Sequence, residues 1–316
     1  MGRAGHMGLA AAMLALALAL ALALATGAAT AGETLPRERP AQSDQNVAAE
    51  TGDMAALQKA AEGGDATAQL RLGDDFYYGN GTAQDFAAAF QWYAKSAAQG
   101  NITAQTLLGV MYAKGVGVEK NFGKAMEWTR KAADAGGVEA MYNVGAAYDN
   151  SLGVDRDLKT AFSWYRKSAE GGYEGAQFNV GNMYEIGEGV DKDLGQAIFW
   201  YQKAADQGYP PAEFNLGRLY LHGEGVPADP ARGRILVEKA ARAGLSLAQL
   251  NMAEFAYAGN GQPVDKVAAY AWALLAADAG DPDARDLLQK MDIGHELDDD
   301  QMKKASDLAD KLSQPE

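Results

Sequence analysis

Small and apolar residues recur along this chain at the spacing of a helix, and the pattern repeats every 36 residues. Within 172–207, Ala176, Val180 and Tyr184 are four residues apart, so they lie on one side of a predicted helix. A glycine at 64, 100, 136, 172, 208, 244 and 280, with an alanine four places after each, keeps the period without slip. A fixed period of this length indicates a solenoid built from one repeated unit.

Each copy predicts two helices joined by a glycine turn. In the copy 172–207 the turn holds Gly187 and Gly189, because paired glycines supply the positive φ that reverses a chain without strain. A second helix then starts at an N-cap residue, which is Asp or Asn in six copies: Asp85, Asn121, Asp157, Asp193, Asp229 and Asp265. One helix pair cannot bury its apolar face alone, so neighbouring pairs must stack.

Two further positions predict close packing between the helices. The first helix carries a glycine at 73, 109, 145, 181 and 217, although glycine inside a helix costs about 1 kcal/mol relative to alanine. Its recurrence predicts that two backbones approach closely there. The second helix carries tryptophan at 92, 128, 164, 200 and 272, and we expect the indole ring to fill the gap between small residues.

The repeated pattern A-x-x-x-L/V-G-x-x-Y-x-x-G-x-G-V-x-x-D-x-x-x-A-x-x-W-Y-x-K-A-A-x-x-G resembles the Sel1-like repeat, a longer relative of the tetratricopeptide repeat, over about 64–290. The resemblance implies an all-α fold, a right-handed superhelical solenoid of helix pairs that binds other proteins. Family members include adaptors of endoplasmic-reticulum quality control and bacterial envelope regulators or virulence factors. This chain departs from the pattern at Ala253 and Ala256, which replace the glycine and the tyrosine, and at Ser151, which replaces the first turn glycine.

The segments outside the repeats have their own signatures. Residues 1–31 hold a basic residue, an Ala/Leu run and a small-residue site, which is the layout of a signal peptide cleaved after Ala31. The alternative is a retained membrane anchor, although the apolar run is shorter than the roughly 20 residues that a spanning helix needs. Residues 32–45 predict a flexible linker, 46–63 an N-terminal capping helix and 291–316 a C-terminal capping helix.

Charge and composition narrow the classes of function. The formal net charge of −14 disfavours nucleic acid and anionic membrane surfaces as partners. The chain has no cysteine, so a structural zinc site would have too few ligands, with only His222 and His295 beyond the leader. We therefore predict no metal and no cofactor. We also expect no membrane insertion after cleavage of the signal peptide.

An enzymatic alternative comes from the resemblance, because some cysteine-rich relatives bind or slowly cleave β-lactams. A serine β-lactamase needs Ser-x-x-Lys, which places a base one helical turn from the nucleophile. No serine beyond the leader is followed three places later by lysine. The sequence therefore favours a non-enzymatic protein over a hydrolase of β-lactams or peptidoglycan.

The sequence offers a surface in place of a catalytic centre. If the first helix of each pair lines the inner curve, as in tetratricopeptide relatives, the sixth residue after the opening glycine faces inward. Aromatic residues hold that place in three neighbouring copies, at Tyr142, Phe178 and Phe214. Other candidates nearby on the same side are Asp149, Asn182, Glu185, Arg218 and Leu221.

Two interpretations of this surface stay open. The aromatic rings either pack between units as core, or line a groove for an apolar helix or an extended peptide, with the acids selecting a basic partner. With the leader, the second interpretation predicts an exported, periplasmic or secreted adaptor or regulator of the bacterial envelope. A secreted factor that binds a host protein is the alternative.

Overall fold

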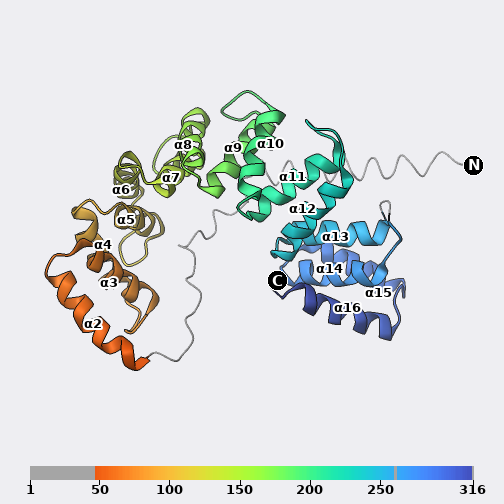
Figure 1. The fold of residues 1–316 in the computed structure, drawn as a ribbon, viewed down its shortest axis with the longest axis horizontal. Helices are drawn as coiled ribbons and strands as arrows, with labels where there is room; N and C mark the ends of the chain where they lie inside the picture. The colour runs from red at the N-terminus through yellow and green to blue at the C-terminus, as the bar shows by residue number, and fades with distance from the viewer. Residues whose placement is uncertain (1–46, 260–261, 315–316) are drawn as a thin grey trace, which may run out of the picture. The chain divides into compact units, whose positions relative to one another are not determined.

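A computed structural model describes residues 47–259 and 262–314, and every regular element within them is an α-helix (Figure 1). The predicted signal peptide and linker lie outside the described residues. The helices are α2 (Val47–Glu62), α3 (Ala66–Tyr78), α4 (Phe86–Ala98), α5 (Ile102–Lys114), α6 (Phe122–Asp134), α7 (Val138–Asp149), α8 (Leu158–Glu170), α9 (Glu174–Ile186), α10 (Leu194–Ala205), α11 (Pro210–His222), α12 (Pro230–Arg242), α13 (Ser246–Ala258), α14 (Lys266–Asp278), α15 (Pro282–Ile293) and α16 (Asp299–Leu312).

The described helices belong to two compact units, which meet in sequence between Trp92 and Tyr93. In the first unit, Ala61, Ala68 and Leu72 of α2 and α3 form a small core, against which Trp92 packs. The helix α2 occupies the place of the predicted N-terminal cap. None of the helices in the described part of the chain has the length and apolarity that a membrane span requires.

In the second unit, consecutive helices from α5 to α15 pack against one another, and α16 packs back against α14 (Figure 1). The predicted all-α solenoid of stacked helix pairs is confirmed. Its core combines many alanines with larger side chains, and a tryptophan joins neighbouring layers: Trp164 packs against α6 and α7 of the preceding layer and Trp200 against α8 and α9. Both indole rings are 7% exposed, as expected for residues that fill the gap between pairs.

The predicted caps and turns are confirmed. All six predicted N-cap side chains accept a hydrogen bond from a backbone N–H of their own helix. The first glycine of the turn has a positive φ, which is 84° at Gly187, and the exceptional Ser151 adopts the same conformation with φ 57°. A serine therefore holds a backbone conformation that side chains with a Cβ adopt only at a cost.

The mid-helix glycines meet two kinds of neighbour. At Gly217 a Cβ atom would lie 2.8 Å from the carbonyl oxygen of Gly233, so the predicted approach of two backbones is confirmed there. At Gly145 and Gly181 the nearest group is a tyrosine ring of the second helix, at 2.7 Å in each case. The rings belong to Tyr165 and Tyr201, whose importance the sequence pattern alone did not indicate.

At several places in the second unit, a buried glutamine forms a hydrogen bond between neighbouring repeats. The side-chain Nε2 of Gln105, Gln177 and Gln249 donates to a carbonyl oxygen at the end of the preceding helix, over 3.1–3.2 Å. At the starts of α7 and α11 the same place holds Met141 and Glu213, side chains without an amide group. Two junctions between layers therefore lack this hydrogen bond.

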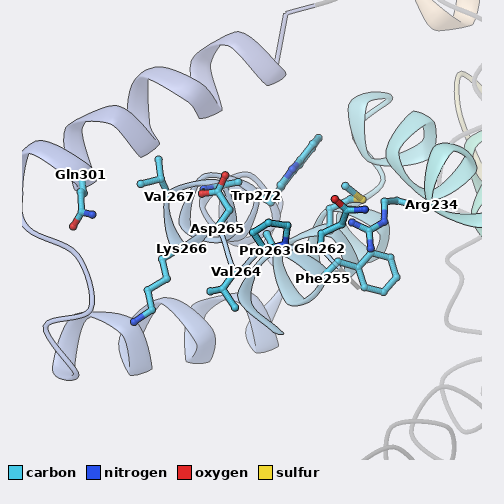
Figure 2. Close-up of a pocket in the computed structure, with 13 residues that line it drawn as sticks. Arg234, Phe255, Gln262, Pro263, Val264, Asp265, Lys266, Val267, Trp272 and Gln301 are labelled. Atoms are coloured by element: carbon cyan, nitrogen blue, oxygen red, sulfur yellow. The ribbon is translucent and has the colours of Figure 1, made fainter. Parts of the chain in front are cut away.

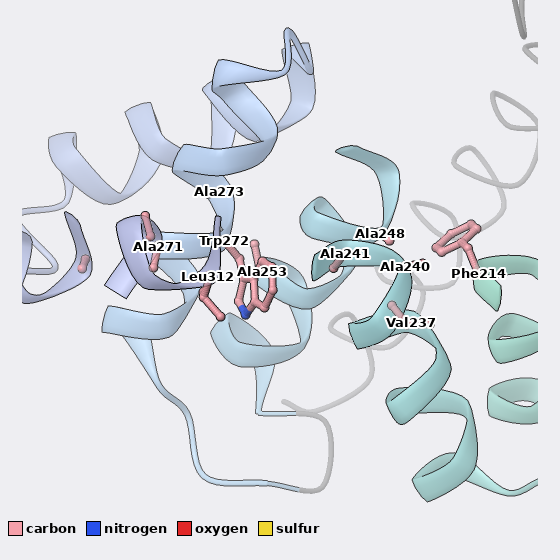
Figure 3. Packing of buried hydrophobic residues seen from close by; sticks show 12 residues of the cluster. Phe214, Val237, Ala240, Ala241, Ala248, Ala253, Ala271, Trp272, Ala273 and Leu312 are labelled. Atoms are coloured by element: carbon pink, nitrogen blue, oxygen red, sulfur yellow. The ribbon is translucent and has the colours of Figure 1, made fainter. Parts of the chain in front are cut away.

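The largest core cluster lies at the C-terminal end (Figure 3). It joins Phe214, Val237 and Ala248 to Trp272 of α14, and α16 covers the far side with Leu312. The start of α16 is fixed by a capping box between Asp298 and Gln301. The acidic last helix thus closes the apolar end of the stack, as the sequence predicts for a terminal unit.

Candidate functional site

Four aromatic side chains from neighbouring repeats form two pairs on the first-helix side of the second unit. We name them the aromatic ridge, which consists of Tyr142, Tyr173, Phe178 and Tyr209. The ring centroids of Tyr142 and Tyr173 are 5.0 Å apart, and those of Phe178 and Tyr209 are 5.6 Å apart. All four side chains are half-buried, so each keeps surface that another molecule can contact.

The three predicted sixth-place aromatics differ in burial. Tyr142 and Phe178 rest on the second-helix tyrosines Tyr165 and Tyr201, at centroid distances of 5.4 and 5.7 Å. These two rings therefore pack against their own repeat and against the next one, and each retains an exposed edge. Phe214 is 5% exposed inside the C-terminal core cluster (Figure 3) and offers a partner little surface.

Tyr173 and Tyr209 occupy a position that has a structural task in other repeats. They are the N-cap residues of α9 and α11 and make no side-chain cap hydrogen bond. At the equivalent places, Asp65, Asn101 and Asp281 each accept a hydrogen bond from the first turn of their helix, whereas Gly137 and Leu245 make no side-chain cap bond either. Giving up such a cap costs about 1 kcal/mol. At the two tyrosines the helix therefore lacks a stabilising cap hydrogen bond that three other repeats have.

The predicted acids Asp149 and Glu185 are engaged within the protein. The hydroxyl of Tyr165 donates to Asp149 over 3.3 Å, and the hydroxyl of Tyr201 donates to Glu185 over 2.8 Å. Glu185 also forms an ion pair with Arg218, in which both side chains are largely buried. Burial and the neighbouring carboxylates raise the pKa of both tyrosines well above the usual range, so their hydroxyls stay protonated as donors.

The other two predicted residues, Asn182 and Leu221, take no part in these hydrogen bonds or in the ion pair. Asn182 is half-buried on α9 and makes no side-chain hydrogen bond within the described residues. Leu221 is half-buried at the end of α11, packed against the C-terminal core cluster. It faces Gly233, where a Cβ atom would lie 2.7 Å from the Leu221 Cγ atom.

Two glutamates give the aromatic ridge a negative potential. Burial raises the pKa of Glu139 on α7, and no ion pair or hydrogen bond of this side chain occurs within the described residues. Burial, then Glu139, Tyr142 and Glu174, raise the pKa of Tyr173 far above its ordinary value. Burial, then Tyr142 and Glu174, raise that of Tyr209 to about 12. The three tyrosines and two glutamates therefore share one acidic, partly desolvated surface.

Sequence analysis missed Tyr165, Tyr201, Tyr173 and Tyr209. A signal for the first two was present, because a tyrosine follows the tryptophan in these copies and faces the mid-helix glycine. For the other two, the signal was a tyrosine at a place where other copies have a capping Asp or Asn. Comparison of the copies with one another, position by position, would have found both.

A separate cavity of about 730 Å³ lies in the last repeat (Figure 2). Its lining includes Phe255, Ala256, Val264 and Trp272, with Arg234 beside the Phe255 ring. The preceding copies have a tyrosine where Ala256 stands, so the smaller side chain leaves space that a ring fills elsewhere. The cavity thus follows from a departure of the last repeat from the pattern.

The described residues show no grouping suited to metal binding, because no three His, Cys, Asp or Glu side chains converge. His222 is exposed at the end of α11, in the turn where the sequence places it. The arrangement on the aromatic ridge can bind and select by shape and charge, through aromatic faces, hydroxyl groups and carboxylates.

The fold and this surface define a class of protein, an α-solenoid whose repeats present side chains to other molecules. The chain belongs to the Sel1 repeat family, whose repeats match residues 66–101, 102–137, 138–173, 175–209, 210–245 and 246–281. The Sel1 solenoid is typically a protein-interaction fold without catalysis. No match to the chain was found among the curated proteins.

Solved structures resemble this chain to different degrees. A Sel1 repeat protein from Oxalobacter formigenes is 29% identical, with a TM-score of 0.67 over 73% of this chain and 98% of that protein. A protective antigen of uropathogenic Escherichia coli is also 29% identical, with a TM-score of 0.35 over 81% and 70%. The cysteine-rich protein B of Helicobacter pylori is 24% identical, with a TM-score of 0.35 over 41% and 92%.

Proposed function

We propose that this protein is a non-enzymatic adaptor or regulator that binds a protein partner on the aromatic ridge. The observation that carries the proposal is the pair of N-cap tyrosines, Tyr173 and Tyr209, which replace a stabilising cap with a half-exposed ring. Departures from a local rule are expected at functional sites. Half-exposed aromatic rings are also the side chains that contribute most to protein interfaces.

We further propose that the protein acts in the periplasm or outside the cell. Support comes from the leader pattern in residues 1–31, with its apolar run and its small residues before Ala31. A fusion of residues 1–45 to alkaline phosphatase should be active in the periplasm and cleaved. The same fusion with Leu18→Arg, which interrupts the apolar run, should stay inactive. Equal activity of both fusions would contradict export through this segment.

Site-specific photocrosslinking tests the binding face. A benzophenone amino acid at Phe178 should give a discrete crosslinked protein band in living cells. The control position is Phe199 on α10, a phenylalanine that is 49% exposed and does not belong to the aromatic ridge. A band from position 199 without a band from 178 would show that the partner binds elsewhere.

The competing function, hydrolysis of β-lactams or peptidoglycan, has a direct test. We expect the purified protein to leave nitrocefin unchanged, because no serine beyond the leader has a lysine one helical turn away. Turnover of nitrocefin that survives repeated purification would contradict the adaptor proposal.

A further inference from the structure

The aromatic ridge combines two features that suit a cation. Aromatic faces attract cations through the quadrupole of the ring, and tyrosine is among the better rings for this contact. Carboxylates beside the rings strengthen the attraction, and here Glu139 and Glu174 lie close enough to affect the ionisation of Tyr173. Phe178 and Tyr209 extend the same surface toward α11 with a second aromatic pair.

No cationic side chain in the described part of the chain pairs with Glu139, which lies in the first turn of α7. The acids that accept a hydrogen bond from the second-helix tyrosines also have cationic neighbours, since Glu185 pairs with Arg218 and Asp149 lies 3.7 Å from Arg156. Glu139, by contrast, is half-buried and has no ion pair within the described residues. A desolvated carboxylate without a cation favours the arrival of one from another molecule.

We propose that the aromatic ridge binds lysine or arginine side chains of a basic segment of the partner, with the cation between the rings of Tyr142, Tyr173 and Tyr209 and the carboxylates of Glu139 and Glu174. This inference rests on the proposed function and names the chemistry of the partner. The alkyl stem of a lysine or arginine lies along an aromatic face while its charged end reaches a carboxylate. Phe178 serves as the apolar contact beside the cation.

The probe is a fluorescent peptide, (Lys-Leu-Gly)4, with (Gln-Leu-Gly)4 as its neutral match. Fluorescence anisotropy at 0.15 M salt measures the Kd of each for the protein that begins after Ala31. We expect the lysine peptide to bind at least tenfold more tightly than the glutamine peptide. At this physiological ionic strength the Debye length is about 8 Å, so attraction to distant charges of the acidic protein is largely screened.

The decisive variant is Tyr173→Asn with Tyr209→Asn, because asparagine is the N-cap residue that the chain itself uses at Asn101. This double variant gains two N-cap hydrogen bonds but loses two ring contacts, so circular dichroism must show that it stays folded at the assay temperature; it should then bind the lysine peptide at least fivefold more weakly. Loss of binding in a protein that stays folded cannot come from unfolding. Unchanged affinity in this variant would overturn the proposal.

A matched pair of charge variants distinguishes a local cation site from attraction to the net charge of the protein. Glu139→Gln with Glu174→Gln should weaken the lysine peptide at least fivefold. Glu119→Gln with Glu127→Gln, which removes the same charge from two exposed positions, should change it less than twofold. Equal loss in both variants would show attraction to net charge only and overturn the proposal.

The proposed adaptor function and the proposed preference for cations can fail separately. If Phe178 crosslinks a partner but the two peptides bind equally, protein binding stands and the cationic preference is wrong. If the lysine peptide binds as expected but neither Phe178 nor Phe199 crosslinks a protein, the cation site stands and the adaptor function is wrong.

Discussion

The central repeats and the last repeat both depart from the repeating pattern, but in opposite ways. The central repeats, α7 to α10, add large side chains, including the tyrosine at the N-cap of α9 and Tyr165, on whose ring Tyr142 of the aromatic ridge rests. The last repeat, α13 and α14, loses them: Ala256 replaces a tyrosine, and Ala253 and Ala273 replace the glycine–tyrosine contact of Gly181 and Tyr201.

The difference teaches how to separate structural from functional departures. In the last repeat the changes compensate one another, because a larger Ala253 meets a smaller Ala273 and both are fully buried. Both regions lack an N-cap bond, at Tyr173 and at Leu245, but in the central repeats the cap is replaced by a half-exposed ring against Tyr142 and the desolvated Glu139 has no ion pair in the described residues. The desolvated carboxylate beside exposed rings is therefore the sign that we take to distinguish a site from a variation in packing.

The largest expected effect comes from the repeat position that is Tyr184 in the central repeats and Ala256 in the last repeat. Tyr184 packs edge-on against Phe162 at a centroid distance of 5.3 Å, so Tyr184→Ala should lower the free energy of unfolding by about 3 kcal/mol. Ala256→Tyr should raise it by about 1 kcal/mol, because the ring enters the cavity beside Phe255 and Trp272. Urea unfolding followed by circular dichroism measures both. A loss of stability in Ala256→Tyr would contradict the origin we assign to the cavity.

The glycine contact gives the next largest effect, with a diagnostic sign. Glycine to alanine in an ordinary helix stabilises by about 1 kcal/mol. Gly181→Ala should instead destabilise by about 2 kcal/mol, because its Cβ would lie 2.7 Å from the buried ring of Tyr201. Ala253→Gly, at the matched place, should cost only about 1 kcal/mol. If Gly181→Ala proves stabilising in the same denaturation experiment, the ring does not restrict this position.

A smaller effect is expected at the exceptional turn residue. Ser151 has a φ of 57°, so Ser151→Gly should raise the free energy of unfolding by about 1 kcal/mol. Gly187→Ser, at the equivalent turn with φ 84°, should lower it by a similar amount. Thermal midpoints of the two variants should move in opposite directions, and a shift in the same direction would refute the argument from conformation.

The smallest effect concerns the pH dependence of stability. Burial raises the pKa of Glu139 in the folded state above its unfolded value, so stability falls as the pH rises from the unfolded pKa to the folded pKa and stays lower above it. Glu139→Gln should therefore stabilise the protein slightly at pH 7 and lose this advantage below the unfolded pKa of about 4.3. Chemical denaturation at both pH values tests this sign. A constant difference would show that ionisation of Glu139 plays no part.

The sequence alone was sufficient for most of the fold. A strict 36-residue period fixes the number and order of helix pairs, and local chemistry fixes their ends, as the caps at Asp157 and Asp193 show. These features are local, since each cap or turn involves residues only a few places apart. For the same reason they could be predicted without knowledge of the packing.

The candidate site was predictable only in part. Phe178 and Phe214 hold the same place in the repeat, yet one keeps an exposed edge and the other is buried, because different residues face them from the next repeat. The pairing of Glu185 with Tyr201 and Arg218 also joins residues distant in sequence. Such contacts depend on the register between helices, which a periodic pattern leaves undetermined.

The missing glutamine bonds bear on how the solenoid deforms. Hydrogen bonds from Gln105, Gln177 and Gln249 tie layer to layer, whereas Met141 and Glu213 interrupt the series on either side of α7 to α10. Bending at these two junctions breaks no such bond, so we expect them to resist bending less than the junctions with a glutamine. The segment α7 to α10, which carries most of the aromatic ridge, should then tilt as one body more readily than its own layers shift against each other.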